Sequence, residues 1–506
     1  MKKLAGLVLL LAILILGGYY GMGVATEHTL KKSINKLDTV NQVNGVHVEV
    51  TQYHRGWFTS TADLKLKLHI AERVIHGQNG QSSVAPAKDY TFNIPLKIDH
   101  GPVVFHNSQL HFGLGYANSS INLPQEYLAQ WNTLFLPQST QPTLDLTFVI
   151  NYTGSVHFQL SVPTFKLFSK LDMGQFEWLG LSNNTNLSPN EQTVEGDFTL
   201  DGINFSKEQT TAKLKNVTSK YALHNTPADL YLGHGALTIQ SLLVQNNTDT
   251  LFSLTDLSID SESDINDALF HTAINTSIDK MVVNNKNYGP GKLSIALKNL
   301  DADVLATIHK QMAQMQQVTD SERQQALIGL LPEIPKLFSK GPVLEISTLH
   351  FVMAEGTVDA NMTVSLPPQD VSNPFQLIQQ IQGQGTIELP KAILKQAILP
   401  AAKQALTAAK KTKDATDDKP AQPVDNTATT ATSEAIATAT SATAAAPTTN
   451  MGIEQQATAM VEKKLADLVQ AQVLLIKGDN YLIKLQLAHG QLLINGKTAD
   501  PALFKF

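Results

Sequence analysis

The sequence predicts an α+β chain that is mostly β: long antiparallel sheets with packed helices, preceded by one N-terminal transmembrane helix. Three features lead to this prediction. Apolar and polar residues alternate over many segments, a few other segments have apolar residues at helical 3/4 spacing, and the chain starts with an uncharged apolar run. Alternation with a period of two is typical of strands with one buried face, and sheets of such strands are usually antiparallel. Long sheets of this kind can curve into a groove or an open barrel.

The apolar run at the N-terminus predicts a membrane anchor whose cytoplasmic tip is residues 1–3. Residues 4–22 carry no charge. A helix of this length can cross a hydrocarbon core of about 30 Å. Lys2 and Lys3 favour a cytoplasmic N-terminus, which places the rest of the chain across the membrane. A cleaved signal peptide is the alternative interpretation, because Gly23-Val24-Ala25 loosely fits a small-x-small cleavage site.

The region from about residue 46 to residue 389 is predicted to be a long, mostly antiparallel β structure. Along its strands one face is aliphatic and the other carries Asp, Thr, Ser, Asn and Lys. Gly154 lies between two alternating segments and therefore predicts a hairpin. The segments with the clearest alternation are 62–70, 94–98, 144–150, 156–162, 293–297 and 358–366.

Helices are predicted where the alternation stops. Residues 303–317 place Leu305, Ile308, Met312 and Met315 on one face, and this spacing favours a helix packed on the sheet over a ligand-binding stripe. Ser321, followed by Gln324, resembles a capping box at the start of the next helix. The predicted helices outside the anchor are 27–36, 125–135, 303–317, one starting near Ser321, 391–411 and 459–472.

Composition divides the chain into four parts. The anchor, residues 1–23, precedes a β-rich domain with helical insertions over residues 24–412. Residues 413–450 form an Ala/Thr-rich tract with almost no large apolar residues. Such a tract cannot offset its ordering entropy, so we predict a disordered linker. Residues 451–506 follow as a helix and a β-hairpin around Ala488-His489-Gly490, and we expect this part to pack back on the main domain.

Composition also excludes several classes of function. The chain has no cysteine, which excludes disulfides, thiol catalysis and Cys-ligated zinc. Its net charge is −6, and arginine occurs only at positions 55, 73 and 323, so no basic patch suited to nucleic acid is present in the sequence. The sequence contains no HExxH, GxSxG, P-loop or GxGxxG motif. We therefore assign no catalytic residue and no cofactor.

Three histidines, His100, His106 and His111, lie close together in the chain. A metal site would need all three on one side of the backbone. If the segment is one extended strand, His106 and His111 are an odd number of residues apart and face opposite ways. We therefore predict surface and turn histidines and no metal site.

The most distinctive local feature is YHRGWFTS at residues 53–60, where one of the few arginines stands beside a glycine and an aromatic pair. The structural interpretation is a turn or bulge: Gly56 supplies backbone freedom, Trp57 and Phe58 pack on the sheet, and Arg55 meets a buried carboxylate or carbonyl. The functional alternative is that Arg55 and Trp57 bind an anionic or lipidic head group. We favour the structural interpretation. The candidate residues are Tyr53, Arg55, Gly56 and Trp57.

Three segments together resemble the YdgA-like family of bacterial envelope proteins: residues 53–60, IDHGP at residues 98–102, and LQLAHGQLLINGK at residues 485–497. The resemblance covers nearly the full chain, although the Ala/Thr tract is longer than the family's usual connection. The family is a domain of unknown function loosely tied to envelope physiology. The resemblance therefore implies a Gram-negative inner-membrane protein that faces the periplasm, and it brings no catalytic residues.

These observations favour a non-enzymatic, membrane-anchored periplasmic protein of envelope maintenance that shields or handles lipid along a dry sheet face. Its expected partners are the inner membrane and either lipid or another envelope protein. A purely structural scaffold, in which helices cover the dry face, is one alternative. The other is a periplasmic hydrolase with an unrecognised site, which needs convergent titratable groups in a cleft. An uncovered apolar groove in the structure would favour lipid.

Overall fold

The fold was obtained as a computed structural model and comprises two compact units. The first unit is Met1–Ala354 with Asn361–Gln382, and the second is Glu355–Ala360 with Gly383–Phe506. Each unit is described by itself. The structure describes residues 2–498 except 42–44, 71–72, 77–81, 107–108, 190–191, 228–229, 316–326, 370–378 and 418–451.

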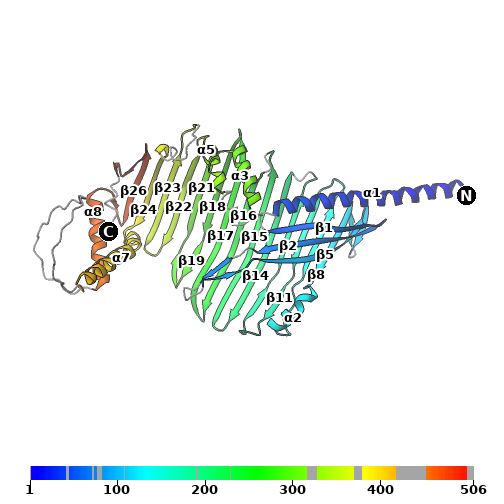
Figure 1. The fold of residues 1–506 in the computed structure, drawn as a ribbon, viewed down its shortest axis with the longest axis horizontal. Coiled ribbons are helices and arrows are strands. Elements are labelled where there is room, and N and C mark those ends of the chain that lie inside the picture. Colours follow the sequence, from blue (N-terminus) through cyan, green and yellow to red (C-terminus); the bar gives the residue numbers. More distant parts are fainter. Residues whose placement is uncertain are drawn as a thin grey trace, which may run out of the picture. The chain divides into compact units, whose positions relative to one another are not determined.

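The first helix, α1 (Lys2–Asn41), is one continuous element of 40 residues. The predicted 27–36 helix is therefore an extension of the N-terminal helix. Figure 1 shows the N-terminal part of α1 projecting beyond the strands of its unit. Among the residues whose side chains are described, no helix combines the length and apolar character needed to cross a membrane. The side chains of residues 1–12, which include part of the predicted anchor, lie outside that set.

One antiparallel sheet dominates the first unit, which confirms the predicted fold class in its coarse form. Hydrogen-bonded neighbours follow the order β1, β2, β5, β8, β9, β10, β13 to β18, β21 and β22. Its strands are β1 (Val46–Arg55), β2 (Thr59–Ile70), β5 (Lys88–His100), β8 (Gly115–Ile121), β9 (Leu144–Ile150), β10 (Val156–Val162), β13 (Leu181–Leu187), β14 (Thr193–Lys207), β15 (Thr210–Asn225), β16 (Tyr231–Asn246), β17 (Asp249–Asn266), β18 (Leu269–Ile278), β21 (Gly291–Asp301) and β22 (Val343–Met353).

Shorter strands extend this sheet or form separate hairpins. β11 (Phe165–Phe168) pairs with β12 (Gln175–Trp178), and β12 pairs with β14. β19 (Lys280–Val283) continues the line of β18 beside β17 and forms a hairpin with β20 (Lys286–Tyr288). Two pairs stand apart from the sheet: β3 (Arg73–His76) with β4 (Ser82–Ala85), and β6 (Val103–His106) with β7 (Gln109–Phe112).

The main core of the first unit lies between α1 and the N-terminal strands. Leu30 and Ile34 of α1 are buried together with Leu64 of β2 and Ile98 of β5. On α1 the buried positions 23, 26, 30, 33 and 34 follow helical 3/4 spacing, so the C-terminal half of the helix presents one face to the sheet. The alternation predicted over 94–98 is confirmed; over 62–70 it holds at Ala62 and Leu64, which are buried, and fades towards Ile70, which is 39% exposed.

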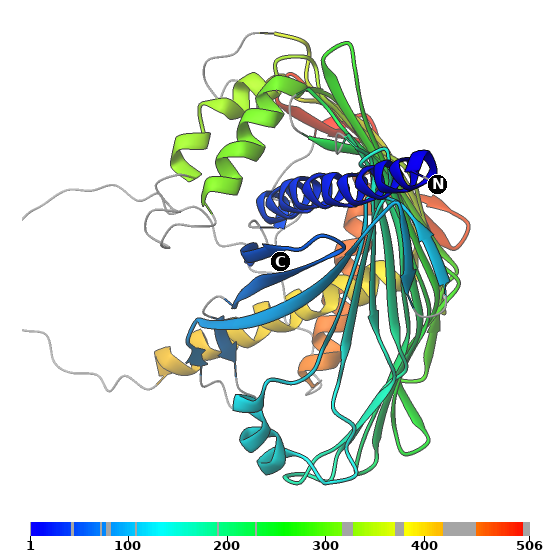
Figure 2. The same cartoon turned by 90° about the vertical axis from the view of Figure 1, so that its right-hand side faces the viewer.

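The long strands form a curved layer, and α3 (Ala302–Met315) lies on its concave side (Figure 2). The predicted helix over 303–317 is thus confirmed, and α2 (Gln125–Leu134) confirms the one over 125–135. The start predicted at Ser321 lies outside the described residues; a short helix, α5 (Glu333–Leu337), follows. The predicted hairpin around Gly154 joins β9 and β10.

The second unit combines two helices with a small sheet. α7 (Lys391–Asp417) and α8 (Ile453–Gln470) confirm the two predicted C-terminal helices. α7 continues five residues into the tract predicted to be disordered from residue 413, which corrects the start of that tract; the rest of it lies outside the described residues. The sheet contains β24 (Gln382–Pro390), β25 (Leu475–Lys477), β26 (Asn480–Ala488), β27 (Gln491–Ile494) and β28 (Lys497–Thr498), and the unit boundary crosses β23 (Gly356–Ser365).

The C-terminal hairpin has the predicted turn. His489 and Gly490 both have positive φ between β26 and β27, the backbone conformation that a tight hairpin turn requires. β26 also pairs along its length with β24, which precedes the Ala/Thr tract in the chain. The tract therefore lies between two segments of one sheet. Residues 499–506, the end of the part expected to pack back on the main domain, lie outside the described part of the chain.

Candidate functional site

The candidate segment 53–60 lies where β1 turns into β2, and its side chains contact α1. Arg55 donates from Nη1 to Oε2 of Glu27 at 2.9 Å and from Nη2 to the hydroxyl of Tyr20 at 3.1 Å. The guanidinium also lies 5.0 Å from the centroid of the Tyr20 ring, a cation–π distance. Arg55 therefore joins the strand turn to the helix.

Gly56 is required at this turn by close packing. A Cβ atom added there would lie 2.5 Å from the carbonyl oxygen of Thr59, and the Gly56 amide donates to that same oxygen at 2.9 Å. The structural interpretation predicted that Trp57 and Phe58 pack on the sheet, and this is wrong. Their rings instead contact tyrosines of α1. Trp57 lies 5.2 Å from the ring of Tyr20, and Phe58 lies 5.1 Å from the ring of Tyr19.

Tyr53 lies on the inner side of the same junction. The ammonium group of Lys31 lies 5.5 Å from its ring centroid. Burial raises the pKa of Tyr53, and the neighbouring hydroxyl of Ser60 opposes that rise. Tyr53, Arg55 and Trp57 thus contact α1, and Gly56 shapes the turn that holds them there.

His100, predicted to be a surface or turn histidine, is instead buried beneath α1, where it forms a polar contact with Ser60. Ser60 Oγ lies 2.8 Å from His100 Nε2, and both residues are about 2% exposed. Burial lowers the pKa of His100 because it disfavours the charged imidazolium. A Cβ added to Gly23 of α1 would lie 2.5 Å from the imidazole ring, so the helix closes directly over this contact. A serine and a histidine at this distance resemble a nucleophile and its base, but helix and strands screen the pair from solvent.

The other two histidines lie in a hairpin, which corrects the prediction that His106 and His111 share one extended strand and face opposite ways. They belong to β6 and β7, and pairing places both on the same face of the hairpin. The side chain of His111 stacks on the ring of Tyr116. The signal for this turn was Asn107-Ser108, two turn-favouring residues between apolar segments. Within the described residues, no three His, Asp or Glu side chains are grouped closely enough to hold a metal ion.

A second feature is the apolar face, defined here as one side of β16, β17, β18, β21 and β22. Cross-strand pairing places its residues in rows, such as Ile274, Ile295 and Ile346, so they share one side of the sheet. The opposite side is polar: Thr238 pairs with Ser258, and Ser258 pairs with Ser277. The apolar face consists of Leu237, Ile239, Leu257, Ile259, Ile274, Ile278, Leu293, Ile295, Leu297, Leu344, Ile346 and Leu349.

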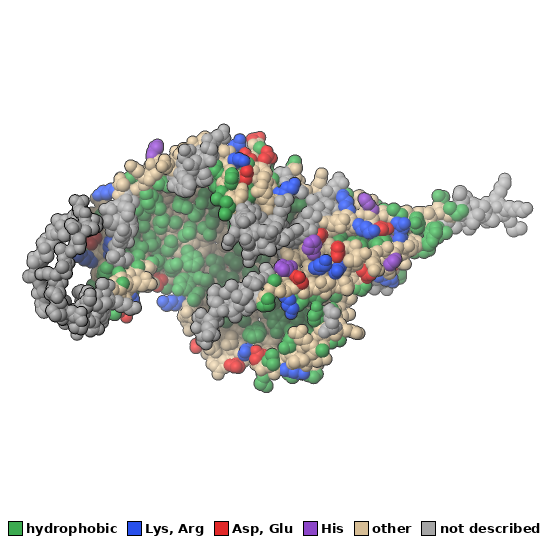
Figure 3. All heavy atoms as spheres, viewed as in Figure 1, with side chains coloured by type: hydrophobic (Ala, Val, Ile, Leu, Met, Phe, Trp, Pro, Cys, Tyr) green, Lys and Arg blue, Asp and Glu red, His purple; other side chains and the backbone are tan. Residues whose placement is uncertain are grey.

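The described residues bury the apolar face only in part. Ile274 is 44% exposed and Leu344 37%, and the other members are of intermediate exposure. By contrast, the equivalent side of β2 and β5 is buried beneath α1, with Leu64, Leu96 and Ile98 at most 2% exposed. Figure 3 shows hydrophobic side chains gathered in a hollow over the long strands, on the face seen in Figure 1.

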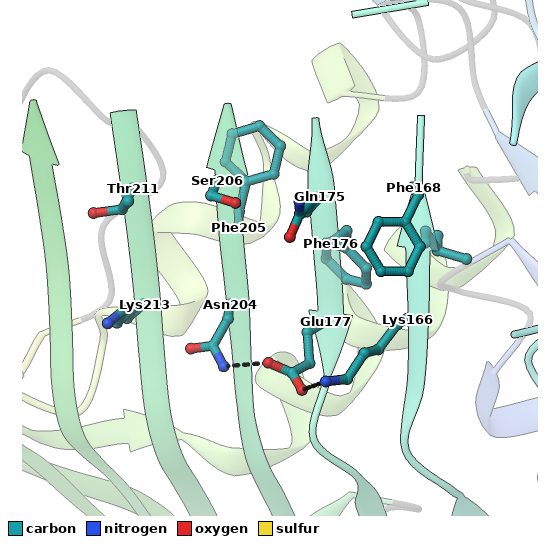
Figure 4. Close-up of a pocket in the computed structure, with 11 residues that line it drawn as sticks. Lys166, Phe168, Gln175, Phe176, Glu177, Asn204, Phe205, Ser206, Thr211 and Lys213 are labelled. Carbon is teal, nitrogen blue, oxygen red and sulfur yellow. Dashed lines mark hydrogen bonds and ion pairs between the residues drawn. The ribbon is translucent and has the colours of Figure 1, made fainter. Parts of the chain in front are cut away.

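A third feature is a polar cleft of about 310 Å³ on β11, β12, β14 and β15 (Figure 4). Lys166 forms an ion pair with Glu177 at 2.8 Å, and Asn204 donates to the same carboxylate at 2.9 Å. The hydrogen bond from Lys166 lowers the pKa of Glu177. The Glu177 carboxylate is therefore ionised, and its charge is already paired with Lys166. The lining residues include no histidine that could activate Ser206.

Residues 1–502 match the model of a protein family described as "Bacterial protein of unknown function (DUF945)". No curated protein and no solved structure matches the chain. The match covers the apolar N-terminal run, nearly all of both units and the candidate segment 53–60.

Proposed function

The chain belongs to the DUF945 family of bacterial proteins of unknown function, and we propose that it is a non-enzymatic, membrane-anchored envelope protein that binds lipid acyl chains on the apolar face. The observation that carries this proposal is the contrast between two parts of one sheet. Strands with the same alternation are fully buried where α1 covers them and are only partly buried over β16 to β22, where Ile274 and Leu344 are exposed. Large contiguous apolar surfaces are rare on soluble proteins unless they bind something.

The chemistry of the apolar face suits an acyl chain. Its members are aliphatic and none of them is charged, so it offers broad apolar contact without directional partners. An acyl chain gains about 0.8 kcal/mol for each CH₂ group that it buries, and it needs no hydrogen bonds from the protein. The helix α3, which lies on the concave side of the sheet (Figure 2), carries Met312, a flexible apolar side chain that is 50% exposed.

The proposed location rests on the N-terminal sequence. The uncharged run 4–22 after Lys2 and Lys3 supports a single-pass inner-membrane anchor with the bulk of the chain in the periplasm. The resemblance of segments 53–60, 98–102 and 485–497 to the YdgA-like envelope proteins supports the same location. An anchored lipid-binding domain has its ligand source beside it.

Photo-crosslinking tests the proposal on the full-length chain. A phospholipid with a diazirine near the middle of its acyl chain is incorporated during reconstitution, and crosslinked peptides are mapped by mass spectrometry. We expect crosslinks in β17, β18, β21 and β22 in addition to those in α1. Crosslinks confined to α1 would show that only the helix meets lipid.

Two adjacent residues of β21 provide a matched control. Ile295 belongs to the apolar face and Ser294 faces the other way. Ile295→Asp should abolish crosslinking at β21 and β22, because it places a charge among the aliphatic side chains. Ser294→Asp should leave crosslinking unchanged. Crosslinking at β21 and β22 that persists at the parental level in Ile295→Asp would count against acyl binding at this face.

The hydrolase alternative depends on the contact between Ser60 and His100. A fluorophosphonate probe should leave Ser60 unlabelled in the folded protein, because both side chains are buried under α1. Labelling of Ser60 that disappears in His100→Ala would favour the hydrolase.

A further inference from the structure

The β6–β7 hairpin carries an unusual exposed face. Val103 pairs with Phe112, and Phe105 pairs with Leu110, so all four large apolar side chains share one side. That side faces outward: Phe105 is 70% exposed, Phe112 62% and Leu110 58%. The other side of the hairpin is the packed one, since Val104 is 4% exposed. The hairpin therefore turns its apolar side away from the protein.

Two aromatic residues of the β1–β2 turn lie at the same end of the unit. Trp57 is 58% exposed and Phe58 is 48% exposed. Tyr19 of α1 connects them to the hairpin, because its ring contacts Phe58 and its hydroxyl donates to the carbonyl oxygen of Val103 at 3.2 Å. We name this set the apolar collar; it comprises Trp57, Phe58, Val103, Phe105, Leu110 and Phe112.

The apolar collar is continuous with the apolar part of α1. Ile13, Leu14, Ile15 and Leu16 are 40–63% exposed and follow one another around the helix just before Tyr19 and Tyr20. Three to six residues separate them from Tyr19, a distance of about 5–9 Å along a helix. Figure 3 shows hydrophobic side chains on α1 next to its grey N-terminal part. Tyrosine and tryptophan with apolar neighbours are the residues enriched at the membrane–water interface.

We infer that the apolar collar is a second membrane contact, by which the first unit docks on the surface of the phospholipid bilayer around α1. The collar contains no charged residue, which favours an apolar partner over a charged protein surface. Because Tyr19 and Tyr20 of α1 contact the collar just after the apolar part of the helix, a bilayer that receives the N-terminal part of α1 meets the collar as well. The first unit is thereby held against the membrane, with the apolar collar in contact with the bilayer.

This inference rests on the membrane anchor of the proposed function, but it does not depend on lipid binding at the apolar face. The collar is formed by the β1–β2 turn and the β6–β7 hairpin, whereas the apolar face is formed by β16 to β22. Crosslinking at the apolar face and membrane contact at the collar can therefore succeed or fail separately.

Spin labelling of the full-length chain tests the inference without background, because the chain has no native cysteine. Phe105→Cys and Leu110→Cys are labelled separately with a nitroxide and reconstituted into vesicles of phosphatidylethanolamine and phosphatidylglycerol. Leu171→Cys is the matched control, since Leu171 is 77% exposed in the turn between β11 and β12, away from the collar. Collisional relaxation is then measured with oxygen, which concentrates in the bilayer, and with a water-soluble nickel chelate.

We expect the oxygen-to-nickel accessibility ratio to be several-fold higher at positions 105 and 110 than at position 171. Two sites are labelled so that the test still holds if one substitution disrupts the hairpin. For each site, the accessibility ratio can be measured again in nanodiscs of the same lipids. Ratios at 105 and 110 equal to that at 171 would overturn the inference. Because the vesicles contain only this protein and lipid, that result would indicate that the collar binds a partner protein and not the bilayer.

Discussion

Arg55 of the β1–β2 turn donates to Glu27 of α1 at 2.9 Å, across a separation of 28 residues. Both side chains are largely shielded from solvent, with 29% of Arg55 and 22% of Glu27 exposed. The contact fixes the position of α1 relative to the sheet edge. The most distinctive sequence segment of this protein thus serves the junction between its helix and its sheet.

Removal of this contact should destabilise the first unit. In Arg55→Ala, Glu27 loses its charged partner and the Tyr20 ring loses its cation. We expect the free energy of unfolding to fall by about 1–2 kcal/mol. This lies between the typical contribution of an exposed ion pair and that of a hydrogen bond to a shielded charge. Chemical unfolding of the reconstituted chain measures it. Lys67→Ala, which removes an exposed pair with Glu49 at 3.6 Å, should change stability by less than about 0.5 kcal/mol. Unchanged stability in Arg55→Ala together with lost cellular function would instead support head-group binding by Arg55.

Gly23 should tolerate no side chain. A Cβ there would lie 2.5 Å from the buried ring of His100, which is held by Ser60. Gly23→Ala should therefore cost about 1–3 kcal/mol through overpacking. Gly17→Ala provides the control on the same helix, because nothing lies within 4 Å of its added Cβ. A thermal unfolding midpoint that is equal in the two variants would contradict the tight seating of α1.

Protonation of His100 should weaken the fold at acidic pH. Burial lowers its pKa in the folded state below the ordinary value of 6.5, so the unfolded chain binds the proton more readily. The stability contributed by neutral His100 is therefore complete above pH 6.5 and is lost as the pH falls from 6.5 towards the lowered pKa. His100→Gln should show a smaller decrease in unfolding free energy between pH 7 and pH 5 than the parent chain. His234→Gln, at an exposed position of β16, should retain the parental slope.

Cleavage within residues 418–451 should leave the two fragments associated. β24 pairs with β26, and a buried core that includes Ala402, Val461 and Leu465 joins α7 to α8. A site-specific protease sequence inserted in this stretch allows one defined cut, and size-exclusion chromatography then reports whether the fragments co-elute.

Co-elution after the cut is the expected result, and Val461→Asp, which places a carboxylate at a fully buried position, should release the C-terminal fragment. Release without any substitution would show that residues 452–498 form a separate domain.

Local patterns were sufficient to predict much of the fold. The alternation of Ile94, Leu96 and Ile98 predicted a strand with one buried face, because side-chain direction in a strand depends only on position. Likewise, Ala488-His489-Gly490 predicted the final turn from backbone preferences alone. The β6–β7 hairpin was missed because its two strands have four residues each, too few for alternation to distinguish a hairpin from one strand.

The sequence by itself determined the strand-rich class of the chain, its main helices and the chemical types available for a site. Each of these follows from interactions between residues near in sequence. The tertiary structure decided which faces are covered. Leu96 and Ile295 lie in strands with the same kind of pattern, yet α1 buries the first fully and the described residues bury the second only in part. The partners of Arg55 and the outward side of the β6–β7 hairpin were decided in the same way, because burial depends on which distant segment packs against a surface.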